Sequence, residues 1–319
     1  MPSIERRPLG NTPFSIAPLV FGGNVFGWTA DQATSFRLLD RFVEGGFNGI
    51  DTADVYSRFA PGKEGGESET VIGNWLAQGG GRREKIVLMS KVGMEMGPER
   101  KGLSREYITR AVEDSLRRLR TDHIDLYQSH QPDGDTPIEE TLRAYADLIQ
   151  SGKVRAIGAS NYSAAQLREA LNASDSEGLP RYETLQPHYN LVHRADYEAE
   201  LEGLCRERGL GVIPYFALAA GFLTGKYRGE ADLEGRPRAV MVKNYMNERG
   251  YKVLNALDSV ATDLDASPAQ IALAWLMARP GITAPIASAT TDEQLDQLMG
   301  AARLRLDEEH IHRLAEASR

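Results

Sequence analysis

The sequence predicts an α/β fold: a closed (β/α)8 TIM barrel with an N-terminal β-hairpin and a long loop after the seventh strand. Short apolar runs rich in β-branched residues recur along the chain, and each is followed by a segment with helical periodicity. The composition does not change along the 319 residues, and barrels of this kind reach this length as one unit. We expect a single domain over residues 1–319, with a doubly wound open sheet as the alternative.

Eight apolar runs qualify as strands, and most of them end in a polar residue. They are Pro18–Gly23, Phe47–Asp51, Ile86–Lys91, Ile124–His130, Val154–Ser160, Thr184–Gln186, Val212–Tyr215 and Ile282–Ser288. Eight parallel strands, each followed by a helix, are the number that closes a TIM barrel.

The segments between the strands carry signals for the start and end of helices. Ser104 is the expected N-cap of a helix whose apolar residues recur on one face, and Gly152 follows the helical segment Pro137–Ser151. The SPAQ sequence at Ser267–Gln270 combines an N-cap serine, a first-turn proline and a capping-box glutamine. These signals predict helices outside the strands.

Three further segments lie outside the repeating units. Ile4–Ile16 contains PLGNTPFS and predicts a hairpin that could cover the barrel floor. Lys226–Gly250 is a long polar insertion of the kind that shapes a ligand site. The chain after Leu306 predicts a short charged helix.

The composition favours a protein that binds small molecules in a reducing compartment. The chain has a formal net charge of −8 with scattered Lys and Arg, which argues against nucleic-acid or anionic-membrane partners. Cys205 is the only cysteine and is expected to be a core thiol. The N-terminus lacks the apolar stretch of a signal peptide, and no run approaches the ~20 apolar residues of a membrane helix. We expect a cytoplasmic location, and the oligomeric state stays open.

Four ionisable or polar residues stand at or just after three neighbouring strand ends. Asp51 ends the second strand, Tyr56 follows on its loop, Lys91 ends the third strand and His130 ends the fourth. In a TIM barrel the chemistry lies at the C-terminal ends of the strands. Each residue alone could be structural, but together they predict a shared site.

The four residues suit one another chemically. A buried lysine needs a counter-charge, which Asp51 can supply. We expect the positive charge of Lys91 to lower the pKa of Tyr56 from about 10 and so make it a usable proton donor. His130 could orient a substrate oxygen. Lys91 alone would also allow a Schiff-base nucleophile, but that nucleophile must be neutral.

These residues lie in motifs that resemble those of the aldo-keto reductases. DTADVY from Asp51, MSKVG around Lys91 and DLYQSH ending in His130 are similar to that family's Asp, Tyr, Lys and His motifs. The similarity continues in GASNYS, LQPHYNL and YFALAAGFLTGKY, so it covers essentially the whole chain.

The resemblance implies a nicotinamide cofactor bound without a Rossmann glycine fingerprint, which the sequence lacks. By motif position, Ser160, Asn161 and Gln186 would hold the carboxamide, and Tyr215 would stack on the nicotinamide ring. The pyrophosphate would follow Leu218, Gly221 and Lys226, and the adenosine end would meet APIASATTDEQLDQL. The full set of implied cofactor residues is Gly23, Asp51, Ser160, Asn161, Gln186, Tyr215, Leu218, Gly221, Lys226, Ser288, Thr290, Gln294 and Gln297.

NADP(H) is the expected cofactor, with NAD(H) as the alternative. Thr290 stands where many members carry the Arg or Lys that reads the 2′-phosphate, and Phe216 stands where a serine is common. Both departures weaken the preference for NADP(H). The phosphate could instead meet Lys226 or Arg279.

The resemblance implies reversible, NAD(P)H-dependent reduction of aldehydes or ketones to alcohols, with Tyr56 as general acid. Asn24, Trp28, Tyr56 and His130 would contact a small carbonyl or alcohol substrate. No metal is expected, and His188 and His193 are interpreted as surface or structural histidines. The alternative function is a nicotinamide-sensing binding subunit of a channel with secondary reductase activity.

Overall fold

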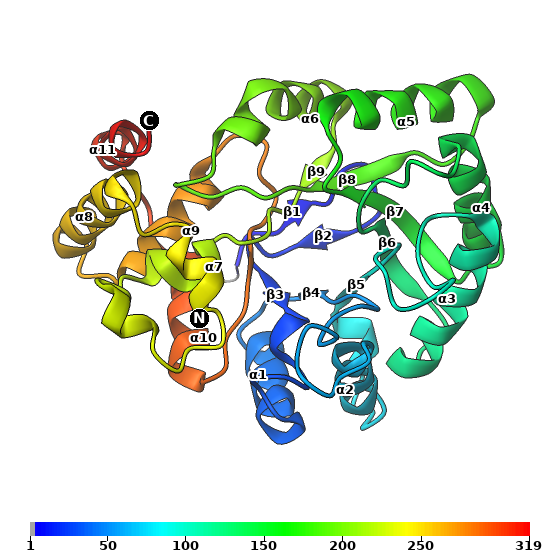
Figure 1. Cartoon of the computed structure of the whole chain (residues 1–319), viewed down its shortest axis with the longest axis horizontal. Coiled ribbons are helices and arrows are strands. Elements are labelled where there is room, and N and C mark those ends of the chain that lie inside the picture. Colours follow the sequence, from blue (N-terminus) through cyan, green and yellow to red (C-terminus); the bar gives the residue numbers. More distant parts are fainter. Residues whose placement is uncertain (1–3) are drawn as a thin grey trace.

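Eight parallel strands surrounded by helices form a barrel in the computed structural model, which describes residues 4–319 (Figure 1). Sheet neighbours follow chain order, and the last strand pairs with the first. The strands are β3 (Val20–Gly22), β4 (Gly49–Asp51), β5 (Val87–Val92), β6 (Ile124–Ser129), β7 (Val154–Ser160), β8 (Tyr182–Gln186), β9 (Gly211–Val212) and β10 (Ile286–Ala287). The predicted fold class is confirmed.

Backbone hydrogen bonds close the ring between β9 and the chain that enters β10. Thr283 N donates to Val212 O at 2.8 Å, and Ile286 N donates to Pro214 O at 2.9 Å. Closure removes the unpaired edges that an open sheet would present. The alternative of an open doubly wound sheet is therefore wrong.

Helices cover the outside of the barrel in chain order. They are α1 (Gln32–Glu44), α2 (Glu67–Leu76), α3 (Arg105–Leu119), α4 (Ile138–Gln150), α5 (Ala164–Glu177), α6 (Glu202–Arg208), α8 (Glu248–Asp263), α9 (Pro268–Ala278), α10 (Asp292–Ala301) and α11 (Glu308–Ala317). A short helix, α7 (Ala239–Lys243), lies in the connection after β9.

The predicted helix ends are confirmed where local signals are strongest. The Ser104 side chain accepts a hydrogen bond from Tyr107 N and caps α3. Ser267 and Gln270 form a capping box at α9. Gly152 has a left-handed φ of +76° just beyond α4, where a Cβ would be strained.

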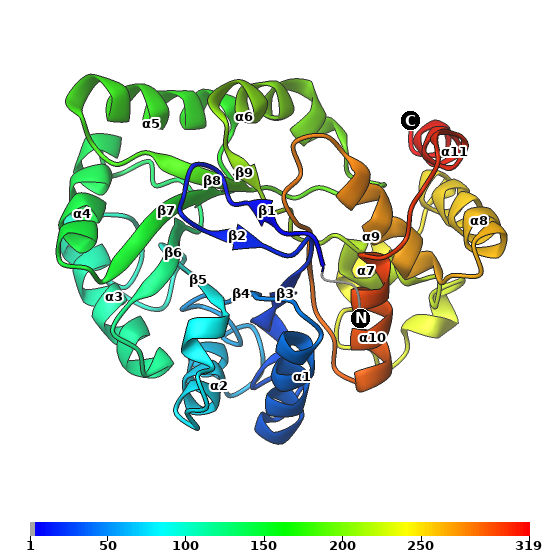
Figure 2. The same cartoon turned by 180° about the vertical axis from the view of Figure 1, so that it is seen from behind.

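The N-terminal hairpin covers the end of the barrel at which the strands begin (Figure 2). It consists of β1 (Arg7–Pro8) and β2 (Ser15–Ile16), which pair antiparallel. Leu9 and Ile16 are fully buried in the barrel's inner apolar cluster, and Arg7 donates to Ile282 O at 3.1 Å. The other residues of this inner apolar cluster lie on the barrel strands or next to their ends: Val20, Val87, Met89, Leu126, Ala156, Ile213, Ala284 and Ile286.

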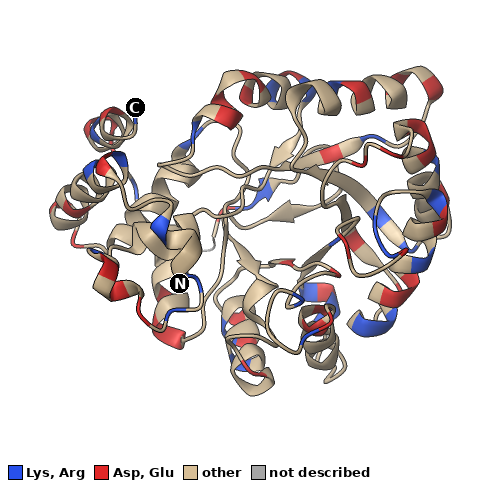
Figure 3. Cartoon of the chain, in the orientation of Figure 1, with Lys and Arg blue, Asp and Glu red and all other residues tan. Residues whose placement is uncertain are grey.

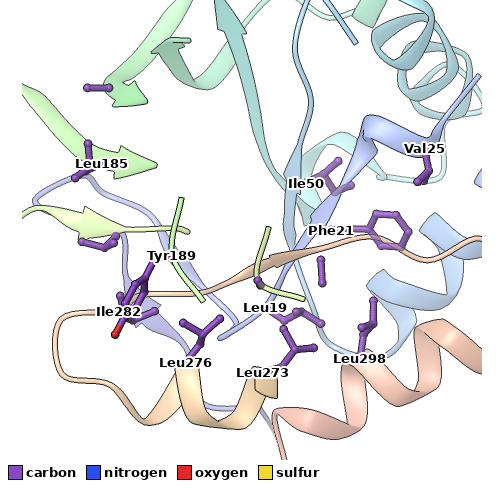
Figure 4. Packing of buried hydrophobic residues seen from close by; sticks show 14 of the residues in the cluster. Leu19, Phe21, Val25, Ile50, Leu185, Tyr189, Leu273, Leu276, Ile282 and Leu298 are labelled. Carbon is purple, nitrogen blue, oxygen red and sulfur yellow. The ribbon is translucent and has the colours of Figure 1, made fainter. Parts of the chain in front are cut away.

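A second, larger apolar cluster lies between the strands and the helices. Figure 4 shows part of it, where Leu19, Phe21 and Ile50 lie across from Leu273 on α9 and Leu298 on α10. Because successive strand side chains point to opposite faces, Leu19 and Phe21 face the helices while Val20 faces the barrel interior.

Several strands are shorter than predicted, and in the last two, β9 and β10, proline limits the pairing. The sequence predicts strands over Val212–Tyr215 and Ile282–Ser288, whereas β9 and β10 contain two residues each. Pro214 and Pro285 have no N–H to donate to a ladder, so regular pairing stops beside them.

The connection after β9 is long, as predicted, but it is not without structure. It contains 3-10 turns at Ala219–Thr224 and Glu230–Leu233 besides α7. The C-terminal α11 confirms the predicted charged helix, and it packs on α8 at the outer edge of the molecule (Figure 1). Arg313 of α11 donates to Asp263 at 2.6 Å.

Lys and Arg are interspersed with Asp and Glu along the outer helices in the view of Figure 3. In residues 4–319, no helix is long and apolar enough to span a membrane.

Candidate functional site

Side-chain alternation gives the barrel interior a polar layer at the end where the strands finish. On β5, Val87 and Met89 belong to the inner apolar cluster, and Lys91 follows in the same register. On β6, Gln128 follows Leu126 in the same way, and pairing places it beside Lys91. The buried members of this polar layer are Asp51, Lys91, Gln128, Ser160 and Gln186.

Lys91 carries a fully buried ammonium group with three acceptors. It donates to Asp51 Oδ2 at 2.7 Å, to Thr52 O at 2.8 Å and to Tyr56 Oη at 2.9 Å. Burial alone would lower the pKa of Lys91, but the charge of Asp51 and the contacts with Asp51 and Tyr56 outweigh it and raise the pKa. Since an ammonium has three N–H donors, this arrangement suits the charged lysine and not a neutral nucleophile.

Asp51 links the lysine to two glutamines. Its Oδ1 accepts from Gln186 Nε2 at 3.0 Å and from Gln128 Nε2 at 3.4 Å, while Oδ2 accepts from Lys91. These donors replace water around a carboxylate that is 1% exposed. Gln186, implied as a carboxamide ligand, therefore directs its NH2 end to Asp51, and no hydrogen bond from residues 4–319 reaches its Oε1.

Tyr56 stands over this pair on the loop after β4. Its hydroxyl accepts from Lys91 and lies 3.4 Å from Asp51 Oδ2. Burial raises the pKa of Tyr56 above 10, and although Lys91 lowers it, Asp51 raises it further. The expectation that Lys91 brings this pKa below 10 is therefore wrong, because burial and Asp51 outweigh the lysine. The phenol is protonated at neutral pH, as a proton donor must be.

His130 directly follows β6 and lies beside Tyr56. The two rings meet edge to face with centroids 5.9 Å apart. Burial, and then the positive charge of Lys91, hold the pKa of His130 well below 6.5, so the imidazole is neutral. Among the described residues its Nδ1 has no hydrogen-bond partner. A neutral imidazole here can orient an oxygen placed next to the Tyr56 hydroxyl.

Ser160, Asn161 and Tyr215 form a connected group beside His130. Ser160 Oγ donates to Gln186 O at 2.9 Å, and Asn161 Nδ2 donates to His130 O at 2.9 Å. Asn161 Oδ1 accepts from the Tyr215 hydroxyl at 2.7 Å. Asn161 has a left-handed φ of +62°, a conformation that Asn tolerates better than most residues.

The backbone after Tyr215 passes repeatedly through the left-handed region. Phe216, Ala219, Ala220 and Gly221 have φ values of +51°, +49°, +57° and +104°. Ala219 N and Gly221 N donate within the loop, to Phe216 O and Leu218 O at 2.7 and 2.9 Å. The step from Leu218, with φ −104° and ψ 20°, to the left-handed Ala219 is the backbone pattern that can bind an anion. Because non-glycine residues are strained here, the loop is a candidate functional feature. Leu218, within this run, packs partly against the core.

Lys226 lies at the end of the same loop. It is exposed, its Nζ stands 5.0 Å from the centroid of the Tyr227 ring, and no carboxylate in residues 4–319 pairs with it. A Cβ added at Gly221 would lie 4.0 Å from Lys226 Nζ, so the lysine borders the left-handed run.

The ends of β3 and β10 bring three implied residues together. Ser288 Oγ donates to Asn24 Oδ1 at 2.6 Å, which ties the implied cofactor residue to the implied substrate residue. Gly23 O accepts from Ser68 Oγ at 2.7 Å, and a Cβ on Gly23 would lie only 2.9 Å from Ser68 Oγ.

The start of α10 holds the residues implied at the adenosine end. Gln294 Oε1 accepts from Thr290 N at 2.8 Å and Thr290 Oγ1 at 3.1 Å, and Thr291 caps the helix. Gln297 is exposed one turn further along. Gln294, in the first turn of α10, thus holds Thr290 in place just before the helix begins.

Two residues beside Trp28 were not singled out from the sequence. Phe59, which is 56% exposed, meets Trp28 edge to face at 4.8 Å, and the Arg238 guanidinium stands 5.7 Å from the Trp28 ring centroid. No acidic side chain among residues 4–319 pairs with Arg238, and burial lowers its pKa while Tyr227 and Tyr56 raise it. Both residues lie in loops, where only membership of a long insertion or Gly-rich stretch could have pointed to them.

Arg279 does not lie where a cofactor phosphate could reach it, so this sequence-based alternative is wrong. Arg279 follows α9, so it lies at the end of the barrel where the strands begin, opposite the candidate site. Its guanidinium pairs with Glu202 at 3.1 Å and with Glu198 at 3.5 Å. Within residues 4–319, no cluster of three or more His, Cys, Asp or Glu side chains could hold a metal ion.

Comparisons with known proteins agree over nearly the whole chain. The model of the "Aldo/keto reductase family" matches residues 18–319. The chain is 37% identical to "Uncharacterized oxidoreductase YrpG" of Bacillus subtilis over 98% of this chain and 95% of that protein. It is 33% identical to "Probable voltage-gated potassium channel subunit beta" of Oryza sativa, covering 93% and 91%, and 30% identical to "Aldo-keto reductase AMT2" of Alternaria alternata, covering 97% and 90%.

Proposed function

We propose that this chain, which belongs to the aldo/keto reductase family, catalyses reversible NAD(P)H-dependent reduction of aldehydes or ketones, with Tyr56 as general acid. The observation that carries the proposal is the pairing of Tyr56 with Lys91. A half-buried phenol lies 2.9 Å from a buried, charged lysine and beside a neutral histidine. Such a phenol can release its proton to an oxygen on which negative charge develops.

Each member of the group has a distinct part in this proposal. His130 and the Tyr56 hydroxyl bind the carbonyl oxygen and orient it. Lys91 stabilises the phenolate that forms as Tyr56 gives up its proton, because its Nζ already donates to that oxygen. Asp51 keeps Lys91 charged through the 2.7 Å ion pair.

The residues around the site fit a nicotinamide dinucleotide. The left-handed run from Phe216 to Gly221 suits a pyrophosphate, and Lys226 and Arg238 are cations without carboxylate partners in residues 4–319. We propose that Ser160, Asn161 and the free carbonyl end of Gln186 hold the carboxamide. Tyr215 would stack on the nicotinamide, which supplies or accepts the hydride when bound.

The remaining implied cofactor residues lie on the strands and helix that border the site. Gly23 and Ser288 would line the cofactor groove, while Thr290, Gln294 and Gln297 would meet the adenosine end. We propose NADP(H) as the preferred cofactor, with Lys226 or Arg238 able to meet the additional phosphate that the neutral Thr290 does not.

The substrate would be a small carbonyl compound with an apolar or aromatic body. Trp28 and the exposed Phe59 provide apolar surface beside a cation, and Asn24 adds a polar contact. The single buried cysteine suits a reducing compartment, and we propose a cytoplasmic location.

A second candidate is a nicotinamide-binding subunit that senses cofactor for a membrane channel. The 33% identity to a protein named as a potassium channel β subunit supports it. The same four side chains would then respond to cofactor redox state, with reduction of carbonyls secondary.

Turnover with a panel of carbonyl compounds tests the proposal directly. We would follow absorbance of NADPH and NADH in parallel with wild type, Tyr56→Phe and Tyr197→Phe. Tyr197 is a matched control, because its buried hydroxyl has no hydrogen-bond partner among the described residues. We expect turnover by wild type and Tyr197→Phe and its loss in Tyr56→Phe. Cofactor binding without turnover on any carbonyl would favour the sensing function.

A further inference from the structure

His188 stands between two other rings in a stacked column. Its imidazole stacks on Tyr215 with centroids 5.3 Å apart and planes at 22°, and on His193 with centroids 3.8 Å apart and planes at 11°. The backbone holds this register, because Tyr215 N donates to Pro187 O at 3.0 Å and His188 forms a parallel bridge with Tyr215. An imidazole has two faces, so Tyr215 covers one and His193 the other.

The groups around His188 Nε2 suit a neutral imidazole. Asn190 Oδ1 accepts from Val192 N at 2.9 Å and from His193 N at 3.0 Å, which fixes the orientation of this fully buried amide. The NH2 end of Asn190 therefore faces His188 Nε2, at 3.4 Å. The same NH2 group donates to Phe216 O at 2.9 Å, and because an amide NH2 only donates, its contact with His188 Nε2 assigns the imidazole proton to Nδ1.

The hydroxyl of Tyr245 also lies next to this nitrogen, and with the proton on Nδ1 the hydroxyl is the donor. It lies 3.1 Å from His188 Nε2 and comes from the long connection after β9, just beyond α7. Burial, and then the charge of His193, lower the pKa of His188 to about 4, in agreement with the neutral form. His193 itself pairs with Asp196 at 3.0 Å.

We infer that His188 is a positioning residue that backs the Tyr215 ring and so sets the plane on which the nicotinamide stacks. The inference rests on the proposed function, in which Tyr215 carries the nicotinamide. Tyr215 is anchored at its hydroxyl by Asn161, edge to face by Phe216 with ring centroids 5.2 Å apart, and by stacking on His188, and it packs partly buried beside the inner apolar cluster. His188 is the ring that lies nearly parallel to Tyr215, at 22°. His188 does not touch the cofactor or substrate. It acts through Tyr215.

The physical reason is that stacking on His188 restricts the tilt of the Tyr215 ring. Without His188, the Tyr215 ring would keep its hydroxyl contact and its edge contact with Phe216 but would lose the parallel ring that fixes its tilt. Aromatic stacking of this kind contributes enough to change an affinity by about 3- to 10-fold. The effect should be confined to ligands that carry the nicotinamide ring.

Calorimetric titration of the full chain tests this with two ligands. One is whichever of NADPH or NADH wild type binds more tightly. The other is its nicotinamide-free counterpart, 2′-phospho-ADP-ribose or ADP-ribose. We expect His188→Ala to weaken the dinucleotide about 3- to 10-fold and to leave the fragment within about 2-fold of wild type. His188→Phe, which restores a ring behind Tyr215, should bring the dinucleotide affinity back to within about 2-fold.

The outcomes separate this inference from the proposed function. Unchanged dinucleotide affinity in His188→Ala would overturn the positioning role, and so would equal weakening of both ligands, which indicates general structural damage. A Phe variant as weak as the Ala variant would overturn the stacking argument. If wild type bound neither dinucleotide, the proposed function would fail first, and this inference would fail with it.

Discussion

Removing the buried counter-charge of Lys91 should cost much of the protein's stability. Asp51→Asn keeps the shape of the side chain but leaves an ammonium that is 0% exposed without its 2.7 Å partner. Breaking a buried ion pair from one side costs about 3–5 kcal/mol, because the other charge remains desolvated. We expect Asp51→Asn and Lys91→Met each to lower the free energy of unfolding by this amount at pH 7.

The double variant distinguishes the pair from its separate members. Asp51→Asn/Lys91→Met removes both charges of this pair and leaves neither one unpaired, so it should lose no more than either single variant, which gives a coupling of about 3 kcal/mol or more. Denaturant unfolding followed by circular dichroism provides the measurement. The same cycle on the exposed pair Arg37–Asp292, at 3.0 Å, is the control and should give under about 1 kcal/mol. Additive losses at Asp51 and Lys91 would refute the reasoning.

The pH dependence of the Asp51→Asn variant gives an independent check within the same experiment. Without Asp51, burial lowers the pKa of Lys91 in the folded state below its unfolded value near 10.4. The unfolded chain then binds more protons than the folded chain, so stability rises with pH. The difference in free energy of unfolding between wild type and Asp51→Asn should therefore become smaller between pH 7 and pH 10.

Three further predictions concern other parts of the chain. Asp54 is buried with neither carboxylate oxygen paired among the described residues, and burial followed by Glu69 raises its pKa to about 8. The folded state therefore holds a proton that the unfolded state releases near pH 4, and wild type loses stability as pH rises toward 8. Asp54→Asn should gain stability relative to wild type over that window in thermal unfolding, and a gap independent of pH would contradict this. Ser267→Ala removes the capping box of α9 and should lower the free energy of unfolding by about 1 kcal/mol in denaturant titrations, whereas an unchanged midpoint would show that the cap contributes nothing. Arg238→Met should weaken dinucleotide binding relative to wild type by about 10-fold at low salt and by less at high salt in fluorescence titrations. The same loss of affinity at both salt concentrations would exclude a charge role for Arg238.

The sequence predicts the barrel well because its signals are local. The capping box at Ser267 and the N-cap at Ser104 depend on residues three positions apart, and both are present in the structure. Strand ends are less predictable. β9 ends before Pro214 and β10 begins only after Pro285, although the apolar runs extend across both prolines.

The sequence indicates which residues form the candidate site, but it does not indicate their pKa values. Alternation from Met89 to Lys91 already places the lysine inside the barrel. The pKa of Tyr56 depends on a balance between burial, Lys91 and Asp51 that only the three-dimensional arrangement fixes. Arg238 was missed because loop residues carry no periodic signal. Arg279 follows α9 and therefore lies at the end of the barrel opposite the candidate site, which no local motif around it indicates.

The central claim is that Tyr56 donates the proton in a hydride-transfer reaction assisted by Lys91. Its most direct test is the single-turnover rate of Tyr56→Phe against wild type, with saturating NADPH and the best carbonyl substrate. The account predicts a rate lowered by about 10²- to 10⁴-fold with dinucleotide affinity within about 3-fold of wild type. A variant that reduces the carbonyl within a few-fold of the wild-type rate would contradict it.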